Sequence, residues 1–298
     1  MLSEPKKVYQ KDYNLLIGRH CSVESPHFLA GAVRETVSYG ANSLMIYLGA
    51  PHNSKRRPVE DLKIPEFKKM LAESKIEIDN VIVHAPYILN FANAIDKKKF
   101  AWSVEFLKKE IVRMEAIGLK TIVLHPGSSL KVPLSTALEQ VINGLDSVLQ
   151  NNTKIRIALE TMSGKGSEVG INFEQIQYII ERIKQKERVG VCWDTCHLWA
   201  AGYDLKNNLE SVIKEFKAKI GLEKLWVIHV NDSLFELGSK KDRHENLGYG
   251  KISWETFPKI IYHPQFNGIV KILETPRQRE VYKTEIKNLV GHCCNNSH

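Results

Sequence analysis

The chain has 298 residues, of which 43 % are hydrophobic and 26 % are charged. This composition is typical of a soluble globular protein, and the length suits one large barrel domain or two smaller domains. No apolar run approaches the roughly 20 residues that span a bilayer, which excludes a membrane-spanning helix. The formal charge of +8 favours polyanionic partners such as nucleic acid, although the same excess is compatible with simple solubility.

The first residues are polar and lack the apolar core of a secretory signal. The five cysteines are odd in number, so a disulfide framework is not expected. We therefore expect a reducing, cytoplasmic environment.

Eight short β-rich runs recur along the chain, and most are followed by a loop and an amphipathic stretch. They are nearly continuously apolar, which is typical of strands buried on both faces of a parallel sheet. The runs are residues 15–19, 43–48, 81–84, 121–125, 155–160, 189–194, 225–229 and 269–274.

The stretches between these runs have the period of helices. In residues 100–118 apolar side chains recur every three or four positions, and Gly118 suits a helix end. Residues 134–149 and 173–183 show a similar period. Eight strand–helix units predict a single (β/α)₈ TIM barrel over residues 1–298, with an open doubly wound sheet as the alternative. Residues 291–298 are expected to form a loose C-terminal tail.

Metal-binding residue types lie where the predicted strands end. In barrel enzymes the active site lies at the C-terminal ends of the strands. A lone histidine there is more often structural, and a lone carboxylate often caps the next helix. Gathered in one barrel mouth, however, such groups would be costly to bury without a cation. The nine candidates are His84, His125, Glu160, Asp194, His197, His229, Asp242, His244 and Glu274.

The candidate ligands also indicate which metal is bound. Imidazoles with carboxylates favour zinc, with Mn²⁺ or Fe²⁺ as alternatives in part of the sites. Nine ligands suit two or three ions with open positions, which is a known arrangement for phosphodiester hydrolysis. Cys192 and Cys196 flank Asp194, and we interpret them as core packing rather than as ligands.

With these residues in view, the sequence closely resembles endonuclease IV, the family-2 apurinic/apyrimidinic DNA-repair endonucleases. The likeness spans about residues 16–277. It is carried by three segments: His84-Ala-Pro-Tyr87-Ile-Leu-Asn90, Asp194-Thr-Cys-His197, and His229-Val-Asn-Asp-Ser followed by Gly238-Ser and Asp242-Arg-His244.

The resemblance implies a centre of three Zn²⁺ ions held by the nine candidate side chains. One ion takes His84 and His125, a second takes Asp194, His229 and Glu274, and a third takes His197, Asp242 and His244, with Glu160 bridging the first two.

The resemblance also implies the reaction. A monomer would hydrolyse the phosphodiester 5′ to an abasic site in double-stranded DNA, leaving a 3′-hydroxyl and a 5′-deoxyribose phosphate, and would trim blocked 3′ ends. Glu160, Asp194 and Glu274 are the implied catalytic carboxylates, and Glu274 would orient or activate the attacking water.

DNA contacts are implied for residues at two loops. Tyr87 and Ile88 match positions that enter the minor groove and fill the gap at the lesion. In the loop after the second strand, where some members carry an inserting arginine, His52 or Asn53 stands here. Trp193 replaces a usual smaller aliphatic residue, a departure that would affect substrate contacts rather than the chemistry.

Two rival functions are compatible with parts of this pattern. A sugar isomerase or epimerase on a related barrel uses one or two divalent metals, but His84, His125 and the Asp242–His244 segment exceed that need. A non-catalytic nucleic-acid-binding protein with structural zinc would have closed coordination and would not nick DNA.

Overall fold

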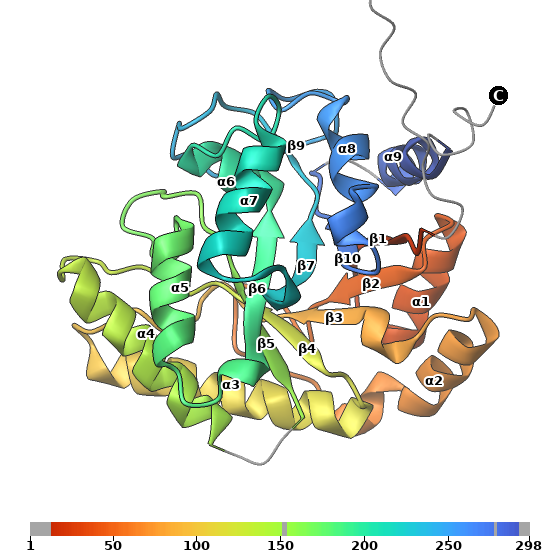
Figure 1. Cartoon of the computed structure of the whole chain (residues 1–298). Coiled ribbons are helices and arrows are strands. Elements are labelled where there is room, and N and C mark those ends of the chain that lie inside the picture. The colour runs from red at the N-terminus through yellow and green to blue at the C-terminus, as the bar shows by residue number, and fades with distance from the viewer. Residues whose placement is uncertain (1–12, 151–153, 277–278, 292–298) are drawn as a thin grey trace, which may run out of the picture.

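Eight parallel strands form a closed barrel at the centre of the molecule, shown as arrows in Figure 1. The structure, a computed structural model, describes residues 13–150, 154–276 and 279–291. Around the barrel the order is β1-β10-β7-β6-β5-β4-β3-β2, so β1 closes the ring by pairing with β10. The strands are β1 Leu16–Cys21, β2 Ser43–Ile46, β3 Val81–His84, β4 Thr121–Leu124, β5 Arg156–Glu160, β6 Val189–Asp194, β7 Leu225–His229 and β10 Val270–Leu273.

This closure confirms the predicted TIM barrel and excludes the open doubly wound sheet. Each predicted strand is present, with ends that differ by no more than two residues. The antiparallel pair β8 (Asp232–Ser233) and β9 (His244–Glu245) was not predicted, because two-residue strands leave no periodic pattern. In the loop after β7, this pair fixes the position of His244.

Helices surround the barrel on its outside (Figure 1). The α-helices are α1 Phe28–Ser38, α2 Ile64–Glu73, α3 Lys97–Ile117, α4 Leu134–Leu149, α5 Phe173–Arg182, α6 Thr195–Ala201, α7 Leu209–Lys219, α8 Thr256–Ile261 and α9 Arg279–Gly291. Short 3-10 helices are η1 Val59–Leu62, η2 Ile78–Asn80, η3 Lys186–Arg188, η4 Leu222–Lys224 and η5 Pro264–Phe266. Within the described residues, no helix combines the length and apolar character needed to cross a membrane.

Capping residues explain where the long helix α3 begins and ends. The Asp96 carboxylate accepts hydrogen bonds from the backbone amides of Lys98 and Lys99, so α3 begins three residues earlier than predicted. It ends at Gly118, whose φ of 98° suits glycine. At the other end of the chain, α9 includes Gly291, while residues 292–298 of the predicted tail lie outside the described residues.

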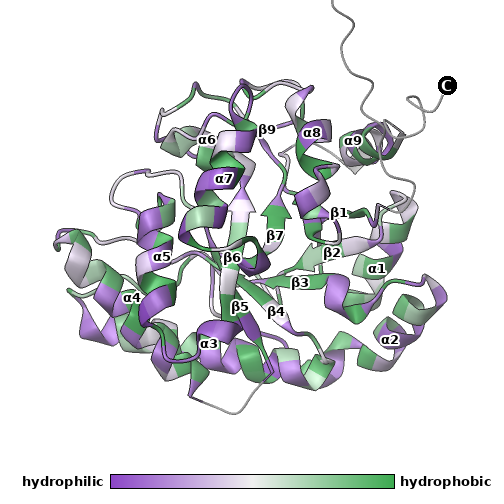
Figure 2. Ribbon diagram, in the orientation of Figure 1, coloured by the Kyte–Doolittle hydropathy of each residue, from purple (hydrophilic) through white to green (hydrophobic). Residues whose placement is uncertain are grey.

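The apolar core has two parts, separated by the wall of the barrel. The outer part packs the strands against the helices, whose apolar faces turn inward in Figure 2. Trp193 belongs to this part, where it lies against Phe173, Phe216 and Phe266. The expectation that Trp193 affects substrate contacts was therefore wrong, because its side chain faces the helices. The inner part fills the barrel and contains Met45, Ile82, Val123, Ala158, Cys192, Val227, Val270 and Ile272.

Candidate metal centre

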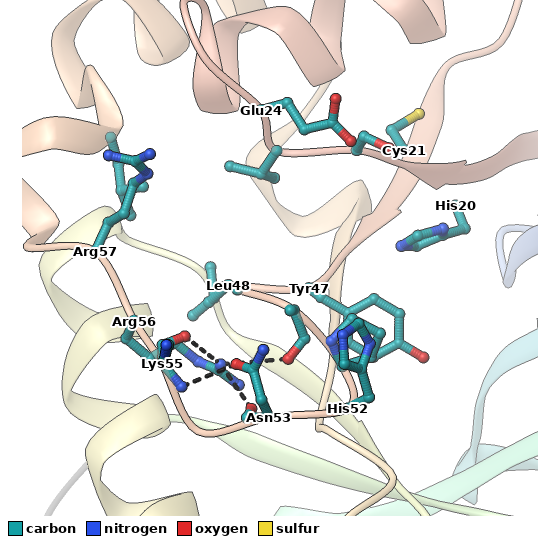
Figure 3. Close-up of a pocket in the computed structure, with 16 residues that line it drawn as sticks. His20, Cys21, Glu24, Tyr47, Leu48, His52, Asn53, Lys55, Arg56 and Arg57 are labelled. Atoms are coloured by element: carbon teal, nitrogen blue, oxygen red, sulfur yellow. Dashed lines mark hydrogen bonds between the residues drawn. The ribbon is translucent and has the colours of Figure 1, made fainter.

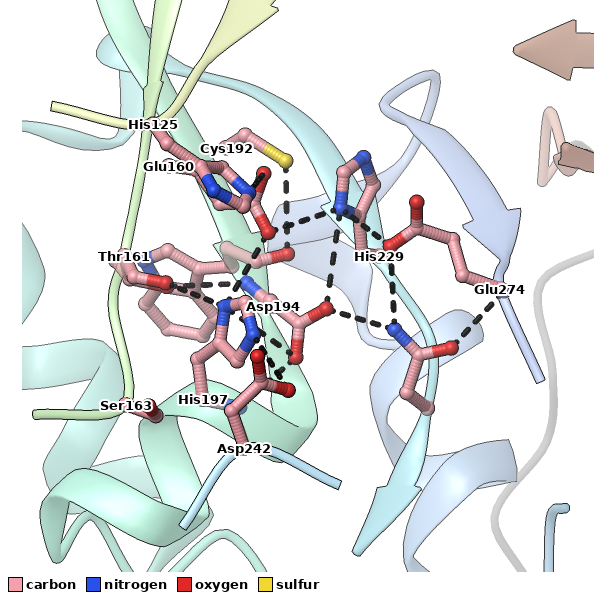
Figure 4. Close-up of polar contacts among 12 residues, drawn as sticks. His125, Glu160, Thr161, Ser163, Cys192, Asp194, His197, His229, Asp242 and Glu274 are labelled. Atoms are coloured by element: carbon pink, nitrogen blue, oxygen red, sulfur yellow. Dashed lines mark hydrogen bonds and ion pairs between the residues drawn. The ribbon is translucent and has the colours of Figure 1, made fainter. Parts of the chain in front are cut away.

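Glu160 joins the metal-binding residue types into one cluster, buried at its centre and partly exposed at its edges (Figure 4). Oε2 of Glu160 lies 3.0 Å from Nε2 of His84 and 3.1 Å from Nε2 of His125. Its Oε1 lies 3.2 Å from Nδ1 of His197 and 3.3 Å from Nδ1 of His229. One carboxylate at the end of β5 therefore contacts imidazoles that follow or end four other strands.

The remaining carboxylates extend the cluster on both sides of Glu160. Glu274 Oε2 lies 3.0 Å from Nδ1 of His229. On the other side, Asp242 Oδ1 lies 3.4 Å from Nε2 of His197, and Asp194 Oδ2 lies 3.5 Å from Nε2 of His244. All nine residues predicted from the sequence are thus brought together in one connected cluster.

Among the described residues, five subsets have ligand atoms close enough to hold one ion, and one of them, Glu160–Cys192–His229, includes a thiol. The other four are His84–His125–Glu160, His84–His229–Glu274, Asp194–His197–His244 and Glu160–Asp194–His229–Glu274, and in every subset the ligand atoms lie within 4.8 Å of one another. Two subsets match the first and second ions of the predicted division, whereas His84–His229–Glu274 joins residues predicted for different ions. Asp194 rather than Asp242 groups with His197 and His244, although Asp242 Oδ1 lies 3.4 Å and 3.7 Å from their Nε2 atoms.

The imidazole nitrogens fit a bound cation. Nε2 of His244 is buried, lies 3.5 Å from Oδ2 of Asp194, and has no hydrogen-bond partner within the described part of the chain, an arrangement that is uncommon without a ligand. His84 donates from Nδ1 to the carbonyl of Ala85 at 2.6 Å, and His197 donates from Nδ1 to the carbonyl of Thr161 at 2.9 Å. These bonds leave Nε2 as the ligand atom, as in many metal sites.

The charges of the cluster show what a cation would compensate. Burial raises the pKa of Glu160, but the charges of His125 and His229 outweigh burial and hold this pKa well below its usual value. Burial lowers the pKa of His125, yet the charge of Glu160 and its hydrogen bond raise it above the usual value. Protons on the imidazoles therefore balance the carboxylates, and a metal ion would replace those protons.

Two buried cysteines lie near the cluster. Burial raises the pKa of Cys192 to about 12 and that of Cys196 to about 12, which favours the neutral thiols. Cys192 Sγ approaches Glu160 and His229 closely, but its side chain belongs to the inner core. Cys192 therefore packs in the inner core, as predicted.

Several residues of the site were missed by sequence analysis. His20 and Tyr47 line the mouth together with the metal-binding types, and Tyr282 reaches it from α9. His20 was missed because β1 was predicted to end one residue before it. Asn231 donates to Asp194 at 2.7 Å, and its Oδ1 accepts from the backbone amide of Glu274 at 2.9 Å. The sequence feature that could have indicated Asn231 is its position two residues after His229.

Of the three predicted DNA-contact residues, Tyr87 alone lines the mouth. Tyr87 is 51 % exposed and contacts the edge of Tyr47 at 6.3 Å between ring centroids. Ile88 is half-buried against the outer core. Asn53 lines a neighbouring pocket (Figure 3), where its Oδ1 accepts from the backbone amide of Lys55 at 2.9 Å.

The fold and the cluster define a TIM-barrel protein with a metal-binding mouth. Residues 33–291 match the family model described as a xylose isomerase-like TIM barrel. The solved structure of D-tagatose 3-epimerase-like protein shares the fold, at 17 % identity and a TM-score of 0.68, over 94 % of this chain and 100 % of that one.

Similarity to nucleases is much higher. The probable endonuclease 4 of Pediococcus pentosaceus is 46 % identical over 262 residues, covering 88 % of both chains. That of Geobacillus kaustophilus is 45 % identical over 282 residues, covering 92 % of this chain and 94 % of the relative. Endonuclease IV from Thermus thermophilus superposes with a TM-score of 0.83 at 27 % identity, covering 94 % of this chain and 99 % of that one. The chain belongs to the endonuclease 4 family, and it is a hydrolase of the AP endonuclease type.

Proposed function

We propose that this chain, as a monomer in the cytoplasm, binds three zinc ions and cleaves double-stranded DNA on the 5′ side of abasic sites. The products would be a 3′-hydroxyl and a 5′-deoxyribose phosphate, and the same site would remove blocked 3′ ends. The observation that carries this proposal is the cluster around Glu160, where nine ligand-type side chains meet at one open mouth.

The donor set supports zinc as the metal. Five imidazoles and four carboxylates with a neutral neighbouring thiol match the ligands that zinc accepts, whereas Mg²⁺ and Ca²⁺ prefer oxygen alone. When bound, such ions supply Lewis-acid stabilisation of the phosphate and activation of water. We assign all nine residues as ligands, with Glu160 as the bridge.

Within this centre, the carboxylates differ in access to the mouth. The side chains of Glu160 and Asp194 are 1 % and 0 % exposed, and their role is to hold ions. The Glu274 side chain is 16 % exposed and faces the mouth. Glu274 therefore orients the attacking water and accepts its proton, while Asn231 fixes the backbone and the carboxylate of Glu274.

The rim supplies recognition of the lesion. The mouth has a volume of about 360 Å³ and would take an extruded sugar–phosphate unit that lacks a base. The exposed ring of Tyr87 lies at its edge and would fill the gap in the duplex, supported by Ile88. Extrusion is cheapest where stacking is already lost, so abasic sites are selected. Asn53 would contact the strand beside this gap.

The decisive test is incision of a duplex that carries one abasic analogue, measured before and after prolonged chelation together with the zinc content. We expect a single nick 5′ to the analogue, close to three zinc ions per chain, and loss of both after chelation. Incision that persists in metal-free protein, or no incision by protein with a full zinc complement, would refute the proposal.

A further inference from the structure

Part of the wall of the mouth is made by residues that are not among the nine metal-binding candidates. They are His20, Tyr47, Pro51, Tyr87 and Tyr282. The function proposed above gives Tyr87 a role at the lesion and assigns no role to the others. Two of these, His20 and Tyr47, carry polar side chains at the surface of the mouth.

Tyr47 lies between the metal centre and the residue that we place in the gap of the duplex. It directly follows β2, and the centre of its ring lies 5.1 Å from that of His84, a proposed zinc ligand. The centre of the Tyr87 ring lies 6.3 Å from that of Tyr47. The sugar of an abasic nucleotide joins the scissile phosphate to the position of the missing base. This sugar would therefore lie beside Tyr47.

His20 lies next to Tyr47 and comes from the neighbouring strand. It belongs to β1, which pairs with β2 in the barrel. The His20 and Tyr47 rings meet edge to face, with centres 4.9 Å apart and an interplanar angle of 70° (Figure 3). Both side chains are partly exposed, and both also line the adjoining pocket of about 580 Å³. Two adjacent strands thus bring a hydroxyl and an imidazole to the same space.

The polar atoms of this pair are available to a ligand. Among the described residues, the Tyr47 hydroxyl and the ring nitrogens of His20 have no hydrogen-bond or ion-pair partner. Tyr282 in the same mouth differs, because its hydroxyl donates to the carbonyl of Thr275. His20 and Tyr47 therefore have hydrogen-bonding capacity at the mouth that no described protein group uses.

An abasic sugar carries a group that matches this pair. Loss of the base leaves a hemiacetal with a hydroxyl at C1′, where an intact nucleotide carries its base. This hydroxyl can both donate and accept, as can the Tyr47 hydroxyl, and a neutral imidazole offers one donor and one acceptor. A phosphodiester oxygen only accepts, so it would leave the acceptor nitrogen of His20 unused. The pair therefore fits the sugar hydroxyl better than a phosphate.

We propose that Tyr47 and His20 bind the C1′ hydroxyl of the extruded abasic sugar and thereby determine which lesions this site prefers. The inference deepens the proposed function and rests on it. A site that is built around a substrate hydroxyl discriminates against an analogue that lacks this hydroxyl. The pair would therefore favour natural abasic sites over lesions that have no hydroxyl at C1′.

The test compares two duplexes of the same sequence, one with a natural abasic site and one with its tetrahydrofuran analogue, which lacks the C1′ hydroxyl. The measured quantity is the ratio of kcat/KM for the natural site to kcat/KM for the analogue, with each full-length variant at the same zinc content. Tyr47→Phe should lower this ratio about fivefold, the effect of one lost hydrogen bond. His20→Leu should lower it as well.

The matched control is Tyr178→Phe, which removes a hydroxyl that donates to Glu139 at 2.6 Å between helices α5 and α4. It should keep the wild-type ratio. An unchanged ratio in Tyr47→Phe or in His20→Leu would overturn the inference. Equal losses on both duplexes give this result too, and they would mean that the side chain contacts a group that both lesions share. Failure of the proposed function would look different, because the wild-type chain would then cut neither duplex.

Discussion

His125 is the residue whose removal best separates metal chemistry from folding. It follows β4, its side chain is 22 % exposed, and its Nε2 lies 3.1 Å from Glu160. We expect His125→Ala to lower kcat for abasic incision at least about a hundredfold, because a ligand of an open site is lost while the core is untouched. Unfolding temperature and circular dichroism should change little. The exposed His27→Ala serves as control, and full activity of His125→Ala would contradict the ligand assignment.

Lys271 is a buried basic side chain outside the metal centre. It lies in β10, fully buried, and its Nζ donates to the carbonyl of Phe266 and to the Tyr13 hydroxyl. Burial lowers the pKa of Lys271 to about 7. Between pH 7 and about 10.5 the unfolded chain then binds more protons than the folded chain, so the free energy of unfolding rises with pH.

This linkage predicts a measurable slope. The contribution of Lys271 is at most about 1.4 kcal/mol per pH unit in that window. Lys271→Met should remove the slope in urea titrations between pH 7 and 10, whereas Lys217→Met, a change on the surface, should keep it. An unchanged slope in Lys271→Met would mean that the lysine stays charged in the folded protein.

At the scale of elements, Arg56 fastens the loop after β2 onto helix α3. Its Nη1 donates to the carbonyls of Asn53 at 3.1 Å and Lys55 at 2.8 Å (Figure 3), while Nε reaches Glu110 at 2.9 Å. A Cβ at Gly49 would lie 2.7 Å from Arg56 Cδ, so glycine at this position lets the arginine pass. The loop therefore depends on one buried carboxylate.

Glu110→Gln should loosen this loop. The guanidinium groups of Arg56 and Arg113 would lose their only shared carboxylate, and a hydrogen bond between charged groups contributes about 1.5–3 kcal/mol. We expect trypsin to cut after Lys55 or Arg56 roughly tenfold faster than in the wild type. Glu105→Gln on the same helix, where the carboxylate is 61 % exposed, should leave cleavage unchanged. Equal cleavage rates in both variants would show that Glu110 does not hold the loop.

The strands of the barrel were predictable because buried parallel strands are continuous apolar runs. The site was predictable because metal-ligating residue types lie at the ends of these runs. The runs that end in Glu160 and Asp194 each predicted a strand and also the candidate ligand at the end of that strand. His20 was missed because the first strand was predicted to end one residue before it, whereas Tyr47 fell inside the predicted second strand and is not a metal-ligating residue type. The pair of guanidinium groups on Glu110 could not be predicted, since a loop and a helix meet there only in three dimensions.

For the whole molecule, bound metal should be a major source of stability. The cluster gathers carboxylates and imidazoles that lie far apart in the unfolded chain, so ions bind mainly the folded state. Chelation should lower the melting temperature by at least about 5 °C, and added Zn²⁺ but not Mg²⁺ should restore it. Calorimetry with metal analysis is the measurement. An unaltered melting temperature in protein verified to be metal-free would show that metal binding at the cluster does not stabilise the fold.

The seam of the barrel has a consequence for how the protein is made. Leu16 in β1 pairs with Val270 in β10, about 250 positions later in the chain. A ribosome that adds roughly 5–20 residues per second leaves this edge of the first strand open for tens of seconds. During that interval the nascent chain carries an unfinished sheet that can pair with a neighbouring polypeptide. The barrel can therefore close only after β10 has been synthesised.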